Sequence, residues 1–282
     1  MRLIDYVCFP GSKLGGGMKS GGGDDRYVFD EAAGWACVID GATDVGPVRI
    51  FQKGESDAAR FAEIFAHELL ANPVRDDETP AQYFARFIAI LRAAAEREAR
   101  VKLDEAPLAS LPTAAATWLR CKHGKLEAAT LGDTMAIVLT PDGKVTHLGD
   151  SGKVDFEREN ALKVMQMTSG DRLKWLQNVR ELHNTEGGYW VFGVQPHAVE
   201  KIMHETLDAP PGTRVLVMSD GFYRLVAPYG RYDDAGLIFA AAEKGLVKLM
   251  KELRAMEQTP EDDAKIGRFK TSDDATALLF EL

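Results

Sequence analysis

Five aspartates in this sequence stand at the boundaries of apolar runs. Asp40 follows WACVI and Asp220 follows RVLVMS, whereas Asp25 precedes RYVF, Asp133 precedes TMAIVL and Asp273 precedes DATALLF. An aspartate in such a place, taken alone, is most simply a turn or cap residue. Several carboxylates that converge, however, repel one another and resist ionisation unless a cation neutralises them. The group as a whole therefore favours a metal site over separate turns.

The chemistry of such a site follows from its ligand atoms. Carboxylate oxygens are the ligands that Mg²⁺ and Mn²⁺ prefer in proteins. Two such ions roughly 3.5–4 Å apart can hold a bridging water or hydroxide, orient a phosphoryl group in line and stabilise charge on the leaving oxygen. The predicted reaction is therefore hydrolysis of a phosphate ester by a metal-bridging water, without a side-chain nucleophile.

The spacing of the apolar residues predicts the elements that position these aspartates. Alternating or continuous apolar runs predict strands at 26–30, 34–39, 113–121, 126–131, 135–139, 144–148, 199–207, 214–218 and 275–282. Apolar residues at helical spacing predict helices at 56–70, 79–103, 171–182 and 246–256. Two of the aspartates then lie at C-terminal strand ends and three at N-terminal ends, and antiparallel pairing brings opposite ends to one edge.

The order of these elements predicts an α+β domain in which helices cover antiparallel sheets, with a doubly wound fold as the weaker alternative. Tight turns between the strands of 113–148 predict an antiparallel meander. We interpret the polar segment 149–197 as an insertion or flap within a single domain, residues 1–282. Seven glycines within residues 11–23 predict a flexible loop that can approach a ligand closely.

Composition narrows the function classes. The 282 residues are 45% hydrophobic and 27% charged, as in an ordinary globular domain. A net charge of -9 without a block of Lys and Arg makes nucleic acid an unexpected partner. Residues 1–10 lack the pattern of a signal peptide, and no apolar run approaches the ~18 residues of a membrane span. Cys8, Cys37 and Cys121 lack metal-ligand spacing, and their odd number favours a reducing cytoplasm.

Five short blocks of the sequence carry a family resemblance. They are WACVIDG at 35–41, PTAAA at 112–116, LGDT at 131–134, MSDG at 218–221 and SDDAT at 272–276. Each block is short, but all occur in the expected order and each lies on a predicted strand boundary. In these blocks the sequence resembles the metal-dependent protein phosphatase 2C family (PPM type), and the resemblance runs through nearly the whole chain.

The resemblance implies a four-layer α/β/β/α sandwich, in which two antiparallel β-sheets are flanked by helix pairs. It also implies a serine/threonine protein phosphatase that acts on phosphorylated proteins and uses two Mg²⁺ or Mn²⁺ ions. In such a site Asp40 would bridge both metals, and the Gly41 carbonyl would bind the second. Asp220 and Asp273 would complete the shell of the first.

Three further carboxylates have outer roles in this comparison. Asp133, together with Asp220, would hold a third metal ion. Asp25 matches the acidic residue that holds metal-bound water, and its neighbour Asp24 occupies the adjacent position. Asp25 is thus a candidate catalytic residue, and either member of the pair could point towards the metals.

The sequence departs from the family where substrate would be contacted. Family members commonly carry a phosphate-binding arginine at the position of Ser20, and here Lys19 is the nearest cation. A lysine lacks the bidentate fork of arginine, so we expect weaker or differently placed phosphate binding by Lys19. The alternative is that Lys19 is a solvated loop lysine. After Gly41 the family usually has His or Met, but this chain has Ala42, so a histidine general acid is absent there.

Asp44 and the histidines are further residues that could transfer protons or hold water in such a site. None of the six histidines stands beside one of the blocks; they are His67, His123, His147, His183, His197 and His204. We therefore expect metal-bound water to protonate the leaving group. Asp44 adds a carboxylate near Asp40 and could hold a further water. In a polar loop, however, an Asx turn is its simpler role.

Other interpretations were weighed against this one. GDSG at 149–152 resembles the nucleophile segment of serine proteases, but no histidine-bearing partner motif precedes it. GMKS at 17–20 resembles part of a phosphate-binding P-loop, but Met18 stands where glycine is required. A pseudophosphatase that serves as a binding module and a phosphatase of small phosphate esters are the two alternatives to a protein phosphatase.

Overall fold

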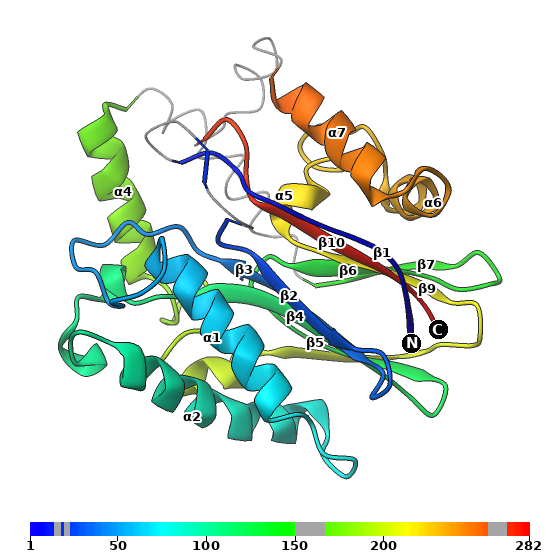
Figure 1. Ribbon diagram of the computed structural model, residues 1–282, viewed down its shortest axis with the longest axis horizontal. Helices are drawn as coiled ribbons and strands as arrows, with labels where there is room; N and C mark the ends of the chain where they lie inside the picture. The colour runs from blue at the N-terminus through cyan, green and yellow to red at the C-terminus, as the bar shows by residue number, and fades with distance from the viewer. Residues whose placement is uncertain (14–17, 20–22, 150–166, 259–269) are drawn as a thin grey trace.

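Two antiparallel sheets of five strands each form the centre of the protein (Figure 1). The computed structural model describes residues 1–13, 18–19, 23–149, 167–258 and 270–282. One sheet consists, in spatial order, of β2 (Arg26–Asp30), β3 (Trp35–Gly41), β4 (Ala114–Lys122), β5 (Lys125–Leu131) and β8 (Met203–Asp208). The other consists of β1 (Arg2–Phe9), β10 (Ala275–Glu281), β9 (Arg214–Met218), β6 (Met135–Leu139) and β7 (Val145–Leu148).

Helices cover the outer face of each sheet. The sheet that contains β3 is covered by α1 (Asp57–Ala71) and α2 (Pro80–Glu98). The other sheet is covered by α6 (Asp234–Lys244) and α7 (Leu246–Glu257), with the short α5 (Asp220–Tyr223) after β9. The remaining elements are α4 (Ser169–Glu181) and the 3₁₀ turns Leu103–Glu105, Leu108–Ser110 and Pro196–Lys201. The predicted four-layer sandwich is therefore confirmed.

The strand β3 shows how the layers are held together. Trp35, Cys37 and Ile39 pack towards α1 and α2. Ala36 and Val38 point to the opposite side, into the apolar layer between the two sheets. Because side chains alternate along a strand, a continuous apolar run buries both faces at once. The strand β3, which carries Asp40 next to its last residue, is thus among the most buried parts of the molecule.

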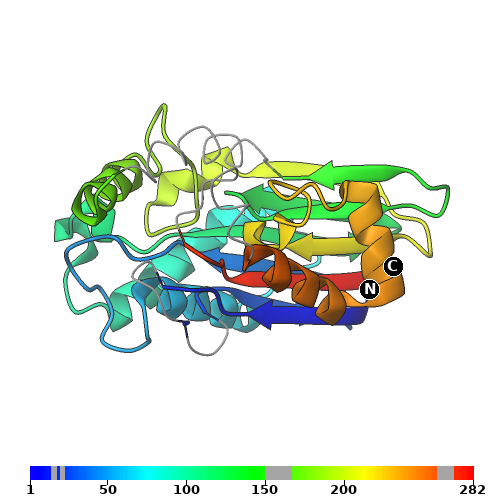
Figure 2. The same cartoon turned by 90° about the horizontal axis from the view of Figure 1, so that it is seen from above.

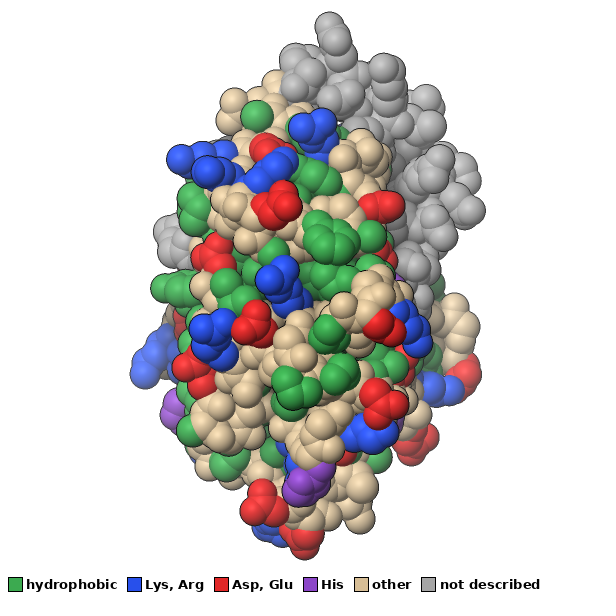
Figure 3. Space-filling model, turned by 90° about the vertical axis from the view of Figure 1, so that its right-hand side faces the viewer, with side chains coloured by type: hydrophobic (Ala, Val, Ile, Leu, Met, Phe, Trp, Pro, Cys, Tyr) green, Lys and Arg blue, Asp and Glu red, His purple; other side chains and the backbone are tan. Residues whose placement is uncertain are grey.

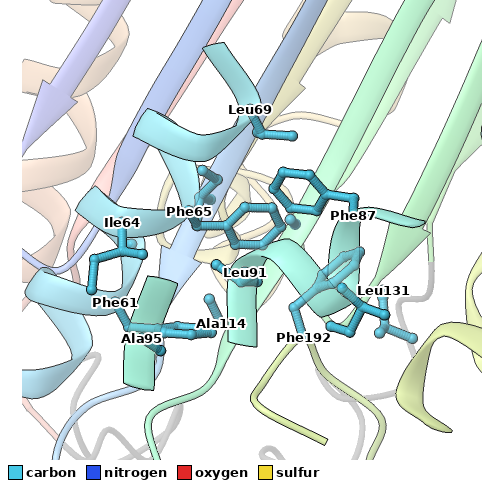
Figure 4. Packing of buried hydrophobic residues seen from close by; sticks show 14 of the residues in the cluster. Phe61, Ile64, Phe65, Leu69, Phe87, Leu91, Ala95, Ala114, Leu131 and Phe192 are labelled. Carbon is cyan, nitrogen blue, oxygen red and sulfur yellow. The ribbon is translucent and has the colours of Figure 1, made fainter. Parts of the chain in front are cut away.

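Aromatic side chains fill the space between α1, α2 and their sheet (Figure 4). Phe65 is fully buried, and its ring centroid lies 5.4 Å from that of Phe87 and 5.0 Å from that of Phe192. Such pairs add to the stabilisation that area burial alone provides. The cluster joins both helices to the chain segment that follows α4.

Some predicted elements differ from the structure. The predicted meander is wrong in one respect, because β4 and β5 belong to one sheet and β6 and β7 to the other. The chain crosses between sheets at Gly132, which has a φ of +92°. The predicted helix 79–103 ends at Glu98, and the predicted strand 199–207 begins as a 3₁₀ turn. Within 149–197, residues 150–166 lie outside the described residues, as does most of the GDSG segment.

Besides the short helix α5, the strand β1 and the helix α6 have no counterpart in the prediction. In β1, an edge strand, Val7 is the one buried residue, so the sequence lacks a clean apolar alternation there. The helix α6 is rich in alanine and shows little amphipathic contrast. Among the described residues, no helix is both long and apolar enough to cross a membrane.

Phe65 tests the importance of the aromatic cluster. We expect Phe65→Ala to lower the free energy of unfolding by about 3–5 kcal/mol, because it leaves a cavity among packed rings. Urea denaturation followed by circular dichroism measures this change. Leu70→Ala on the same helix is the control, since Leu70 is 55% exposed and should cost under about 1 kcal/mol. Equal losses in both variants would contradict the packing described.

Candidate active site

Strand register places Asp25 and Asp40 at the same end of their sheet. Arg26, directly after Asp25, pairs with Ile39, directly before Asp40. Both neighbours lie in regular antiparallel pairing, so the two aspartates leave the hairpin side by side. The sequence predicted this hairpin, and its register follows from the short turn between β2 and β3.

The second sheet presents its aspartates at the same end of the sandwich. Met218, the last residue of β9, pairs with the first residue of β6 and with the third residue of β10. Asp220 follows this end of β9, whereas Asp133 and Asp273 precede β6 and β10. In two views this end lies opposite the chain termini, on the side of α4 (Figures 1 and 2). At the terminal end, Lys, Arg, Asp and Glu side chains are interspersed over the surface (Figure 3).

Asp40 is at the electrostatic centre of the site. Burial, together with the negative charges of Asp25, Asp220, Asp133 and Asp273, raises the pKa of its carboxyl well above the usual range. The strand-end carboxylates thus lie close enough to repel one another. A cation bound at Asp40 would relieve this repulsion.

Asp25 is fully buried and fixed by a serine from the other sheet. Ser219 donates its hydroxyl to Oδ2 of Asp25 at 2.8 Å and accepts a hydrogen bond from the Thr276 N–H at 3.0 Å. Oδ1 of Asp25 is buried and accepts no hydrogen bond among the described residues. Burial, followed by the charge of Asp274, raises the pKa of Asp25 to about 7. Ser219 is a positioning residue that the sequence did not single out, although it stands inside the MSDG block.

Two glycines let the backbones of different blocks meet. A Cβ atom at Gly221 would lie 1.8 Å from the carbonyl oxygen of Asp274, and one at Gly41 would lie 2.6 Å from that of Asp24. These distances leave no room for any side chain. The glycines of MSDG and WACVIDG are therefore required for close approach of the chain segments that carry the aspartates.

Asp24 and Asp274 both contact Lys19, one of the described residues of the glycine-rich segment. The Asp274 carboxylate accepts hydrogen bonds from the backbone N–H groups of Gly11 at 2.6 Å and Asp24 at 3.1 Å. The Lys19 ammonium contacts the carboxylates of both aspartates, that of Asp274 at 2.6 Å. Burial opposes the charge of Lys19, but the two carboxylates hold its pKa above the ordinary value. With a side chain only 9% exposed, Lys19 is no solvated loop lysine. Ser20 lies outside the described residues.

Asp273 is contacted by a cation on each carboxylate oxygen. The Lys270 ammonium contacts Oδ1, and Arg224 donates to Oδ2 at 2.9 Å. Burial opposes ionisation of Asp273, but Lys270 and then Arg224 hold its pKa well below the usual range. This carboxylate is therefore already neutralised, in contrast to Asp40. Neither cation was predicted as a site residue from the sequence.

The loop after Gly41 leads to α1. Asp44 accepts hydrogen bonds from the backbone N–H groups of Asp57 at 2.7 Å and Ala58 at 3.0 Å. These are two of the N–H groups that a helix N-terminus leaves without partners. Asp44 thus caps α1 from a loop 13 residues earlier in the chain, which differs from the local Asx turn predicted for it.

One histidine reaches a motif block through the fold. Ala42 donates its N–H to the carbonyl of Thr113 at 2.9 Å, and Oγ1 of Thr113 lies 3.3 Å from Nδ1 of His183. His183 is far from the PTAAA block in sequence, so spacing alone could not place it there. It brings an imidazole close to the loop that follows Asp40.

The donor set of the site fits a hard divalent cation. In the described part of the chain, no three carboxylate, imidazole or thiol groups are already gathered into one metal-binding cluster. The fit rests on the buried Oδ1 of Asp25, which lacks a partner there, and on the uncompensated charge around Asp40. Oxygen donors of this kind suit Mg²⁺ and Mn²⁺.

Asp25 makes the stability of the metal-free protein depend on pH. Its folded pKa of about 7 lies above the ordinary value of 3.8, so the folded state binds this proton more tightly. The contribution to stability is therefore lost as pH rises from about 4 to about 7. In EDTA at pH 8, we expect Asp25→Asn to raise the free energy of unfolding by about 1–4 kcal/mol. In urea denaturation this gain should shrink towards pH 5, and a pH-independent gain would contradict the assignment.

Comparisons with known proteins place the chain in a family. The sequence profile of protein phosphatase 2C matches residues 22–265. No curated protein matches the sequence. The serine/threonine phosphatase PstP/Ppp of Mycobacterium tuberculosis is structurally similar at a TM-score of 0.54 and 14% identity, covering 100% of this chain and 99% of that one.

Two further solved structures share the fold. The serine/threonine phosphatase of S. agalactiae has a TM-score of 0.54 at 15% identity and covers 98% of both chains. The catalytic domain of PstP in complex with two manganese ions has a TM-score of 0.51 at 13% identity, covering 99% of this chain and 98% of that one. At such identities a structural match shows the fold, whereas the profile match over most of the sequence shows the family. The chain belongs to the protein phosphatase 2C family.

Proposed function

We propose that this chain is a metal-dependent phosphomonoester hydrolase that removes phosphate from serine and threonine residues of proteins. The observation that carries this proposal is the convergence of strand-end aspartates on Asp40, whose pKa is raised by burial and by the charges of the other four. A site with this much negative charge repels a phosphate dianion, so cations must precede the substrate. The manganese ions bound by the related PstP domain support the same conclusion.

The residue roles follow the predicted scheme. Asp40 would bridge two metal ions, the Gly41 carbonyl would bind the second, and Asp220 with Asp273 would bind the first. Bound Mg²⁺ or Mn²⁺ ions supply positive charge to the phosphoryl oxygens and activate a bridging water. Asp133, together with Asp220, would hold a third, outer metal ion.

The chain's own polar groups would orient water and phosphate. Ser219 holds Oδ2 of Asp25, which leaves the buried Oδ1 to accept a hydrogen bond from water in the site. Lys19 has three ammonium donors and contacts Asp24 and Asp274 with two of them. The third donor would be the one that meets the substrate phosphate. Asp24 thus serves mainly to hold Lys19 in this proposal.

Turnover of para-nitrophenyl phosphate tests the hydrolase. We expect activity with Mn²⁺, none in EDTA, and a loss of more than about a hundredfold in Asp40→Asn and Asp220→Asn, since both variants remove a metal ligand. Asp142→Asn, in the exposed turn between β6 and β7, is the matched control and should keep full activity. Absent or metal-independent turnover by the native chain would favour a pseudophosphatase instead.

The substrate class needs a separate comparison. We expect kcat/KM for a phosphoserine or phosphothreonine peptide to exceed that for a phosphorylated sugar by at least about tenfold, because a peptide also contacts the surface around the metals. Steady-state release of inorganic phosphate measures both. The reverse order would identify a phosphatase of small phosphate esters.

A further inference from the structure

We propose that Lys270 and Arg224 are built-in counter-ions of Asp273 that compete with metal for this carboxylate. The metal ion that needs Asp273 therefore binds more weakly than the other ion, which Asp40 and the Gly41 carbonyl would hold. This inference rests on the proposed metal-dependent function and concerns the same site. In this proposal, Lys270 and Arg224 limit how many metal ions the site holds at a given metal concentration.

The contacts at Asp273 leave no carboxylate oxygen without a cation. Lys270 lies on Oδ1 and Arg224 on Oδ2, the latter at 2.9 Å. The side chains of Lys270, Arg224 and Asp273 are 10%, 14% and 17% exposed, so water screens these pairs only weakly. An incoming metal ion must displace at least one of the cations or share the carboxylate with it.

The two cations are held to different degrees. Arg224 also lies 3.6 Å from the carboxylate of Glu257, which is buried and is itself paired with Arg254 at 2.6 Å. Arg254 in turn donates to the carbonyl oxygen of Asp273 at 2.8 Å. Arg224 is therefore part of a network that holds the backbone at the start of the SDDAT block.

Lys270 has a weaker second contact. Beyond Asp273, its ammonium reaches Oγ1 of Thr43 at 3.3 Å. Thr43 belongs to the loop that follows Asp40 and Gly41, so Lys270 connects the two sheets across the site. Its long, unbranched stem can swing away without disturbing the backbone. Lys270 is thus the cation that a metal ion would displace.

Asp40 offers a metal ion no such competition. Within the described residues it forms no ion pair with Lys or Arg, and its surroundings are dominated by other carboxylates. Asp40 would contact both ions, so the ion that is also bound by the Gly41 carbonyl, and does not need Asp273, should bind at lower metal concentration. The ion that needs Asp220 and Asp273 should bind only at higher metal concentration.

Mn²⁺ binding to the full chain tests this without any turnover. Isothermal titration calorimetry, and electron paramagnetic resonance of free Mn²⁺, give the number of ions and their affinities. For the native protein we expect two steps of unequal affinity. Lys270→Met removes the competing charge, so the weaker step should tighten by at least about tenfold.

Three further variants complete the design. Lys270→Gln is a second neutral variant that keeps a polar group beside Thr43, and it should also tighten the weaker step. Lys270→Arg keeps the charge and should leave both steps near the native values. Lys251→Met removes an exposed charge on α7 and controls for the change in net charge. Circular dichroism confirms that each variant is folded.

The outcomes separate the two proposals. Unchanged or weakened Mn²⁺ binding in both neutral variants, with normal binding by the native chain, overturns the role of Lys270 and leaves the hydrolase intact. An equal gain in Lys251→Met would also overturn it, because net charge would then explain the effect. If the native chain binds no Mn²⁺ at all, the proposed metal site itself is wrong.

Discussion

Repulsion among buried carboxylates at one end of the double sheet is the constraint on which the rest of this structure depends. Asp40 is the last residue but one of the buried strand β3, and burial and four other aspartates raise its pKa. Nothing local favours this arrangement, so it persists because apolar packing on both faces of β3 stabilises the strand that carries it. Packing thus supplies the free energy that keeps the charges together.

The fold answers this repulsion differently at different carboxylates. Around Asp273, Lys270 and Arg224 supply positive charge directly. Lys19 does the same for Asp24 and Asp274. Asp25 and Asp40 have no such cation in the described residues, and burial and the neighbouring carboxylates raise the pKa of both. An exchangeable cation is consequently needed more around Asp25 and Asp40 than around Asp273.

Prediction from sequence succeeded where the signal was local. Strand-end aspartates such as Asp40 and Asp220 could be found because an apolar run and its boundary lie within a few residues. Lys270 stands only three residues before Asp273, but a lysine in such a place looks like an ordinary surface charge. Arg224 lies 49 residues from Asp273 in sequence and meets it only in the fold. Ser219 and His183 were also missed, because their partners Asp25 and Thr113 are distant in sequence. The split of the predicted meander between two sheets is equally non-local, since β6 pairs with β9, about 80 residues later in the chain.

Ser20 stands where family members commonly carry a phosphate-binding arginine, and this difference affects how the substrate phosphate would be neutralised. A family arginine would bring a permanent, bidentate charge to the phosphate, whereas Lys19 already contacts Asp24 and Asp274 with two of its three donors. Most of the neutralisation of a substrate dianion must then come from the metal ions. Substrate affinity in this chain should therefore follow metal occupancy more closely than in relatives with that arginine. Because Lys270 limits occupancy at Asp273, one lysine would couple the metal supply to the strength of phosphate binding.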